Sequence, residues 1–124
     1  MPDAPASEEF PEKPLEKLPV LVLCRDLIFA TKISGTAQAL GVRVKMIRDP
    51  AKLGNEPGAR LIADLNLDQA IHAAAAWREA TGGQVVAFVS HADAETIERA
   101  RPAGIDRIMA RSQFVLSLPD LLRS

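Results

Sequence analysis

The sequence predicts a doubly wound α/β domain, with a parallel sheet of five strands in the order 2-1-3-4-5 and helices on both faces. From Pro19 onward, short apolar runs alternate with segments of helical period, which is typical of successive strand and helix units. Several of the apolar runs are continuous rather than alternating, as expected for strands covered on both faces. These two observations favour a parallel sheet between two helical layers.

Five strands are expected, at residues 19–24, 42–47, 59–64, 84–90 and 105–110. The first, PVLVLC, is a continuous apolar run and belongs at the centre of the sheet. The second, VRVKMI, alternates polar and apolar residues, so it is half exposed and is predicted as an edge strand.

The first helix is expected to begin after Asp26, whose carboxylate is suited to cap it. Gly41 ends this helix, and one apolar stripe is predicted at Ala30, Ile33, Ala37 and Leu40. The next connection, residues 48–58, holds two prolines and two glycines and leaves room for one helical turn at most.

Three further helices are predicted in the second half of the chain. An alanine-rich helix follows the third strand and ends at Gly82 and Gly83. Asp93 is expected to cap the next helix. The last segment is predicted to start at a Ser112 cap and to break into two short helices at Pro119, because proline fits the first turn of a helix better than its interior.

Composition limits the class of protein. A chain of 124 residues is expected to form one domain, residues 19–124, after a disordered tail at 1–18 that holds four of the nine prolines. The 15 basic and 16 acidic residues nearly cancel, so neither a nucleic acid nor a membrane is expected as a partner. A single cysteine excludes an internal disulfide and suits a reducing compartment, which predicts a cytoplasmic protein.

Candidate site residues follow the predicted strands. In a parallel sheet of this kind, ligand sites form at the carboxyl ends of the strands where the strand order reverses. The polar or reactive residues at those ends are Cys24, Arg25, Asp26, Asp64, Ser90, His91 and Arg111.

Three segments, LIADLN, VVAFVSHAD and AGIDRIMARS, resemble the third, fourth and fifth strand motifs of the receiver domain of bacterial two-component response regulators. The resemblance spans roughly residues 19–123 and implies a flavodoxin-like fold. It places Asp64 at the phosphorylated aspartate, Ser90 at the switch serine or threonine, and Arg111 at the invariant lysine, seven residues after Gly104.

The chain departs from this family at the metal site. Receivers carry a pair of acids after the first strand, and Cys24 and Arg25 stand in their place. Magnesium requires oxygen ligands, and Asp26 lies one residue late and is better explained as a helix cap. No metal and no cofactor are therefore expected. The aromatic position of the fifth strand is Ile108, and the second helix is nearly absent, which together indicate a degenerate, stand-alone pseudo-receiver.

The leading functional prediction is a protein without enzymatic activity that acts as a protein-interaction module in signalling or regulation, as a monomer or weak homodimer with an unidentified protein partner. With Arg25 and Arg111 near it, Asp64 is expected to form an ion pair rather than to accept a phosphoryl group. Two alternatives stay open. One is a phosphoacceptor receiver that uses Asp64 with a non-standard metal site, and the other is a small-molecule binding domain at the strand-end crevice.

Other reactive residues favour ordinary structural roles. Cys24 is better explained by core packing than as a nucleophile, because neither a phosphatase-type arginine nor a glycine-rich turn follows it. His72 and His91 have no second ligand at metal spacing. The arginines around the fourth helix and fifth strand alternate with acids, so they are expected to form a solvated mixed face: Arg99, Arg101, Arg107 and Arg111, with Glu95, Glu98 and Asp106.

Overall fold

The computed structural model describes residues 18–89, 94–105 and 107–123. Residues 1–17 of the tail predicted at 1–18 lie outside these ranges, and so do Ser90, His91, Asp93 and Asp106. The described residues form one parallel sheet in the order β2-β1-β3-β4-β5, which confirms the predicted order. Its strands are β1 Val20–Leu23, β2 Val44–Ile47, β3 Arg60–Asp64, β4 Val85–Val89 and β5 Arg107–Ala110.

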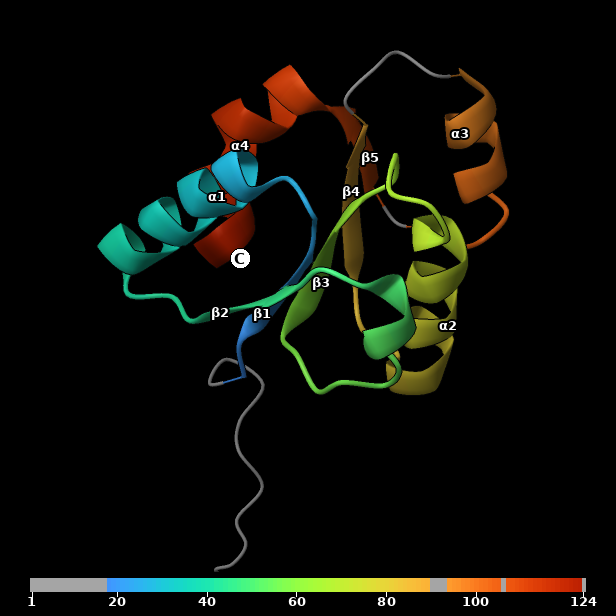
Figure 1. Ribbon diagram of the computed structural model, residues 1–124, viewed down its shortest axis with the longest axis horizontal. Helices are drawn as coiled ribbons and strands as arrows, with labels where there is room; N and C mark the ends of the chain where they lie inside the picture. Colours follow the sequence, from blue (N-terminus) through green and yellow to red (C-terminus); the bar gives the residue numbers. More distant parts are fainter. Residues whose placement is uncertain (1–17, 90–93, 106, 124) are drawn as a thin grey trace, which may run out of the picture.

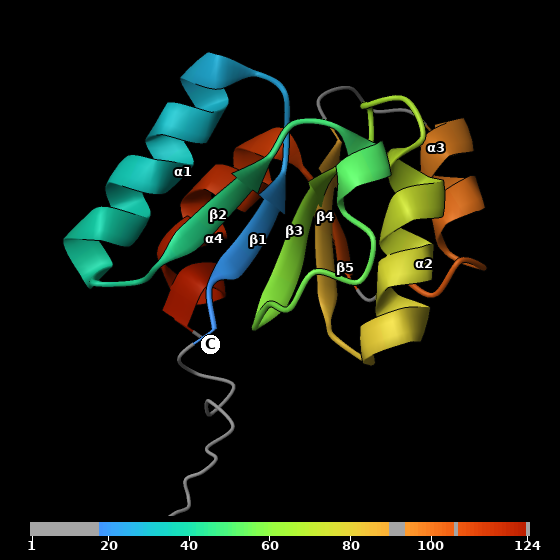
Figure 2. The same cartoon turned by 60° about the horizontal axis from the view of Figure 1, so that its bottom comes forward.

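Helices cover both faces of this sheet, as predicted (Figures 1 and 2). One face packs against α1, Leu27–Leu40, and α4, Arg111–Arg123; the other packs against α2, Ala70–Thr81, and α3, Ala94–Ala100. Side chains of β1 alternate between the two faces: Val20 and Val22 join the α1 and α4 side, whereas Leu21 and Leu23 join the α2 side. Both cores therefore include β1, an interior strand of the sheet.

Three phenylalanines fill the core beneath α1 and α4. The Phe88 ring stacks on Phe114 with 4.6 Å between centroids, and Phe29 lies 5.0 Å from Phe88. The predicted stripe of α1 was right for Ile33 and Ala37, which are buried, but it omitted Phe29. Ala30 and Leu40, which were in the stripe, are only partly buried.

The connection between β2 and β3 holds a single 3₁₀ turn, η2, at Pro50–Lys52, which confirms the prediction of one turn at most. The Asp49 carboxylate caps this turn by accepting the Ala51 N–H at 3.0 Å. Leu53 follows this turn and is 1% exposed, so its side chain packs into the core on the face of the sheet that a longer helix would otherwise cover. The α2 face of the sheet is consequently covered by two helices and a short turn.

Helix α4 corrects the sequence prediction. It begins at Arg111, directly after β5, so Ser112 lies inside it, and it continues without a break through Pro119. Phe114 and Leu118 are buried before the proline, and Leu121 and Leu122 after it. Burial of each large apolar side chain contributes about 1.5–3 kcal/mol, which offsets the roughly 3 kcal/mol cost of a proline in a helix.

The far end of α4 is tied to the sheet by Arg60, the first residue of β3. Its Nη1 donates to the carbonyl oxygens of Leu121 and Leu122 at 2.8 and 3.4 Å. Burial lowers the pKa of the Arg60 guanidinium below its ordinary value. These bonds satisfy carbonyls at the helix end that have no partner within the helix.

The carboxyl-terminal ends of α1 and α2 lie at the glycines that the sequence predicts. Gly41 and Gly82 both adopt left-handed backbone, with φ of 73° and 72°, and end α1 and α2 as predicted. Within the described ranges, no helix combines the length and the apolar character needed to cross a membrane.

Candidate functional site

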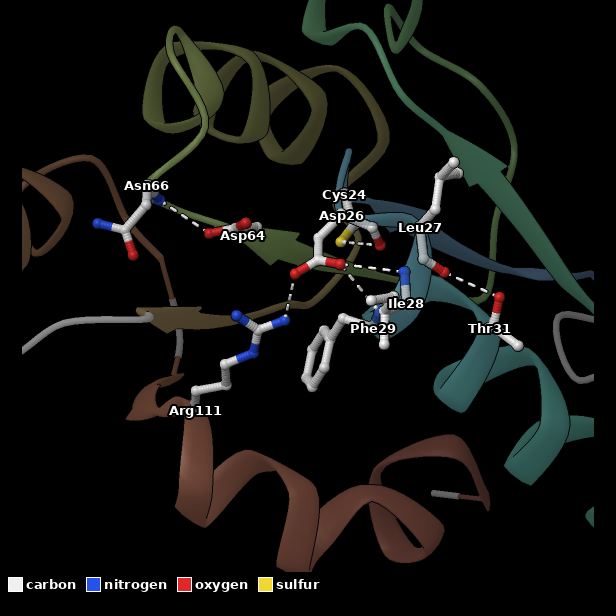
Figure 3. A network of polar contacts seen from close by, with 9 residues as sticks. All are labelled: Cys24, Asp26, Leu27, Ile28, Phe29, Thr31, Asp64, Asn66 and Arg111. Atoms are coloured by element: carbon white, nitrogen blue, oxygen red, sulfur yellow. Dashed lines mark hydrogen bonds and ion pairs between the residues drawn. The ribbon is translucent and has the colours of Figure 1, made fainter.

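The carboxyl ends of β1, β3 and β5 bring together Asp26, Asp64 and Arg111 (Figure 3). Arg111 Nη2 donates to Asp26 Oδ2 at 2.8 Å. The same guanidinium lies over the Phe29 ring, 3.9 Å from its centroid, which is a cation–π contact. Arg111, the first residue of α4, therefore links that helix to the first turn of α1.

Asp26 acts as the cap of α1, as predicted. Its Oδ1 accepts the backbone N–H groups of Ile28 and Phe29 at 3.0 and 3.1 Å, while Oδ2 receives Arg111. The hydrogen bond from Arg111, followed by that from the Phe29 amide, holds the pKa of Asp26 below its ordinary value. Both carboxylate oxygens are thus used to hold the protein together.

Asp64 is the last residue of β3 and is half-buried. Its Oδ1 accepts the backbone N–H of Asn66 at 3.0 Å. Burial raises the pKa of Asp64 above its ordinary value, and the hydrogen bond from the Asn66 amide and the nearby charge of Arg111 oppose this shift only in part. The carboxylate lies in a site that disfavours its charge.

The ion pair predicted for Asp64 is wrong: among the described residues, Arg111 pairs with Asp26 instead. The reason is the start of α4, because a helix beginning at Arg111 lets that side chain lie over Phe29 and reach the cap of α1. Arg25 is exposed and lines a cavity beside η2 and α2.

Cys24 belongs to the core, as expected. It is 1% exposed, and its Sγ lies 3.8 Å from the Asp26 carbonyl oxygen, to which the thiol donates. Burial raises the pKa of this thiol, which keeps it protonated and weakly nucleophilic.

The residues in the place of the receiver metal site do not fit magnesium. Cys24 offers a buried thiol, and the Asp26 carboxylate is engaged by Arg111 and by two backbone amides. Over the described part of the chain, no three His, Cys, Asp or Glu side chains are grouped so that they could hold a metal ion. The positions of Ser90 and His91 fall outside the described residues, so their predicted roles stay predictions.

Solved structures of receiver domains share this fold. A response regulator of Burkholderia pseudomallei, with a phosphorylated aspartic acid, a calcium ion and citrate, matches at a TM-score of 0.71 and 18% identity, over 87% of this chain and 68% of that one. The receiver domain of a Pseudomonas aeruginosa sensor histidine kinase, with magnesium in its active site cleft, matches at a TM-score of 0.70 and 17% identity, over 86% of this chain and 94% of that one. A response regulator from Thermotoga maritima matches at a TM-score of 0.68 and 15% identity, over 86% of this chain and 95% of that one.

These comparisons confirm the resemblance at the level of architecture. No family profile matches the sequence, and no curated protein matches it. The chain has the fold of a response regulator receiver domain, with a five-stranded parallel sheet of flavodoxin-like order.

Asp64→Asn is expected to stabilise the protein at about pH 7, because it removes a charge that folding takes out of water. An aspartate whose folded pKa is raised binds its proton more tightly in the folded state. Its ionisation therefore opposes folding above the folded pKa, and this penalty disappears as the pH falls through that pKa towards the ordinary value of 3.8. Urea denaturation should show the gain at about pH 7 and its loss at about pH 3.

Asp26→Asn is the matched control, and it should change stability in the opposite direction. The pKa of Asp26 is lowered, so its ionised form supports folding at neutral pH, and this contribution is lost as the pH falls through the folded pKa. Asparagine keeps the capping oxygen but removes the charge that Arg111 binds. A destabilised Asp64→Asn variant would instead restore the ion-pair hypothesis.

Proposed function

We propose that the protein is a non-catalytic pseudo-receiver that acts as a protein-interaction module in signalling or regulation. The observation that carries this proposal is the ion pair between Arg111 and Asp26. It joins α4 to α1 at the carboxyl ends of the strands, and it engages Asp26, the carboxylate after β1 that would otherwise stand with Asp64 as a metal ligand. The site is then a fixed structural link rather than a reaction centre.

The chemistry of phosphoryl transfer supports the same proposal. Transfer to a carboxylate requires positive charge to neutralise the phosphoryl oxygens, which a metal supplies in phosphotransfer enzymes. Cys24 and Arg25 cannot supply the oxygen ligands that magnesium requires. Receiver domains of this fold serve as signalling modules, and no enzymatic activity is proposed for this chain.

The proposed partner is a protein, and the proposed contact surface consists of α3, β5 and α4, the output face that the family resemblance implies. Leu116 lies on α4 with 80% of its surface exposed. The same surface includes β5, which is an edge strand of the sheet and a place where another chain can make contact. A cytoplasmic location and a monomeric or weakly dimeric state are part of the same proposal.

A phosphoacceptor role for Asp64 is the second candidate. It is favoured by the half-buried carboxylate, which accepts the Asn66 amide and forms no ion pair with the other described residues. The raised pKa of Asp64 also sets it apart from a simple surface acid. The Burkholderia protein carries a phosphorylated aspartic acid within the same fold.

Calorimetric titration with Mg²⁺ and incubation with acetyl phosphate separate the two candidates. We expect no saturable heat at millimolar Mg²⁺ and no phosphoryl mass added to the intact protein, because Cys24 and Arg25 supply no carboxylate and that of Asp26 is engaged. Calorimetry is preferred to Trp77 fluorescence, since the indole lies in the core beneath α2, away from the site.

Arg25→Asp is the matched variant for this experiment. Arg25 is exposed, so the substitution adds a carboxylate beside Asp26 without disturbing the core. We expect this variant to bind Mg²⁺ more tightly than the parent protein. Saturable Mg²⁺ binding by the parent, together with phosphorylation that Asp64→Asn abolishes, would replace the pseudo-receiver proposal with the phosphoacceptor one.

A further inference from the structure

A cavity of about 620 Å³ lies beside the receiver-like site, between η2, the loop after β3 and α2. It exists because the connection between β2 and β3 holds a three-residue turn where a doubly wound fold normally holds a helix. Figure 2 shows this short green turn beside α2. The volume lies within the range of roughly 300–1,000 Å³ that is typical of small-molecule sites.

The cavity has an apolar wall and charged groups of both signs. Pro50, Leu67, Ala73 and Ala76 supply apolar surface. Arg25 and His72 line it as basic side chains, and Asp49 and Asp68 line it as acids. The Asp49 carboxylate already caps η2 through the Ala51 amide, which leaves Asp68 as the exposed acid without a capping role.

This mixture of charges limits the class of ligand. A ligand with only negative charge would meet Asp49 and Asp68, and a ligand with only positive charge would meet Arg25. A molecule that carries one group of each sign is complementary to both kinds of side chain. The apolar wall additionally requires an apolar body of modest size.

The backbone at the cavity wall is also unusual. Gln69 has φ of 70°, and it is the one residue other than glycine with positive φ in the described part of the chain. It lines the cavity between Asp68 and the start of α2. Left-handed backbone is unfavourable for a residue with a side chain, and such positions gather at ligand sites.

We propose that this cavity binds a small zwitterion with an apolar body, the chemistry of a free aliphatic amino acid. Arg25 receives the carboxylate, Asp68 receives the ammonium group, and the apolar body lies against Leu67, Ala73 and Ala76. The proposal gives a role to Arg25, which takes no part in the ion pair at the neighbouring site. It goes beyond the pseudo-receiver function and does not depend on it.

Thermal shift and calorimetric titration with free L-leucine, L-isoleucine, L-valine and L-methionine test the proposal. We expect at least one of them to raise the melting temperature of the parent protein saturably. The matched amine and the matched carboxylic acid, each lacking one charge, should bind at least about tenfold more weakly, because one charge-assisted contact is lost.

Three variants locate the site. Arg25→Gln removes the cation, and Ala76→Phe fills the cavity at an exposed position without changing charge; both should reduce the affinity at least about tenfold. Arg107→Gln is the matched control, because Arg107 is an exposed arginine on the opposite edge strand and does not line the cavity. Circular dichroism establishes that each variant is folded.

Two results would overturn the proposal. One is the absence of a saturable shift with all four amino acids for the folded parent protein. The other is binding that Arg25→Gln and Ala76→Phe leave unchanged. Neither result bears on the Mg²⁺ and acetyl phosphate experiments, so the two proposals fail independently.

Discussion

Phe88→Ala is expected to lower the free energy of unfolding by about 3–5 kcal/mol, the range found for phenylalanine truncation in protein cores. Phe88 has no exposed surface and contacts both Phe29 and Phe114. Its removal leaves a cavity between β4 and the helices α1 and α4, lined by the rings of Phe29 and Phe114. Urea denaturation followed by circular dichroism measures the loss.

Ile28→Ala is the control for this substitution. Ile28 is also a large apolar residue, but 86% of its surface is exposed at the start of α1. Its truncation should change the free energy of unfolding by less than about 0.5 kcal/mol. A loss of similar size in both variants would contradict the assignment of Phe88 to the core.

Gly83→Ala should cost about 2–3 kcal/mol, near the upper end of the range for overpacking. A Cβ atom at Gly83 would clash with Cη2 of Trp77 and would lie 2.7 Å from Cζ3 of the same ring. The indole is fully buried, and its Nε1 donates to the Glu56 carbonyl at 2.8 Å, so the ring cannot swing aside without losing this hydrogen bond. Trp77 fluorescence should shift as its surroundings change, in parallel with the stability measured by denaturation.

Gly35→Ala provides the opposite result in the same assay. Gly35 lies in α1, and a Cβ atom there would meet no described atom within 4 Å other than those of its chain neighbours and of its own helix backbone. Alanine is favoured over glycine in a helix, so we expect a gain of about 0.5–1 kcal/mol. If Gly83→Ala were as stable as the parent protein, the close approach of Gly83 to Trp77 would be wrong.

Local patterns were enough to predict most of the architecture. The continuous apolar run in β1 indicated a strand covered on both faces, and both faces are covered. Asp26 and Gly41 bounded α1 because capping is a local property. Whether the last helix breaks at Pro119 is not a local property, since it depends on which residues of α4 are buried against the sheet. Propensity favoured a break there, and tertiary packing overrode it.

Three of the predicted site residues lie together: Asp26, Asp64 and Arg111. Arg25 lines the neighbouring cavity, and Ser90 lies outside the described residues. Proximity at the strand ends correctly suggested that Asp64 and Arg111 lie near each other. Which carboxylate Arg111 binds depends on the starting residue of α4 and on the ring of Phe29, and neither has a signal in the sequence. The cavity beside η2 depends on how a loop folds against α2, which spacing alone does not determine.

Helix α4 is held by an arginine at each end. Arg111 binds the cap of α1 at one end, and Arg60 binds the last carbonyls at the other. Since Arg60 and Asp64 are the two ends of β3, the strand that carries the acid also anchors the helix proposed to meet the partner. The helix is therefore fixed at both ends rather than free to swing about one of them. A partner that displaced one end of α4 would also strain the contacts at its other end. We therefore expect α4, β3 and α1 to open as one cooperative unit.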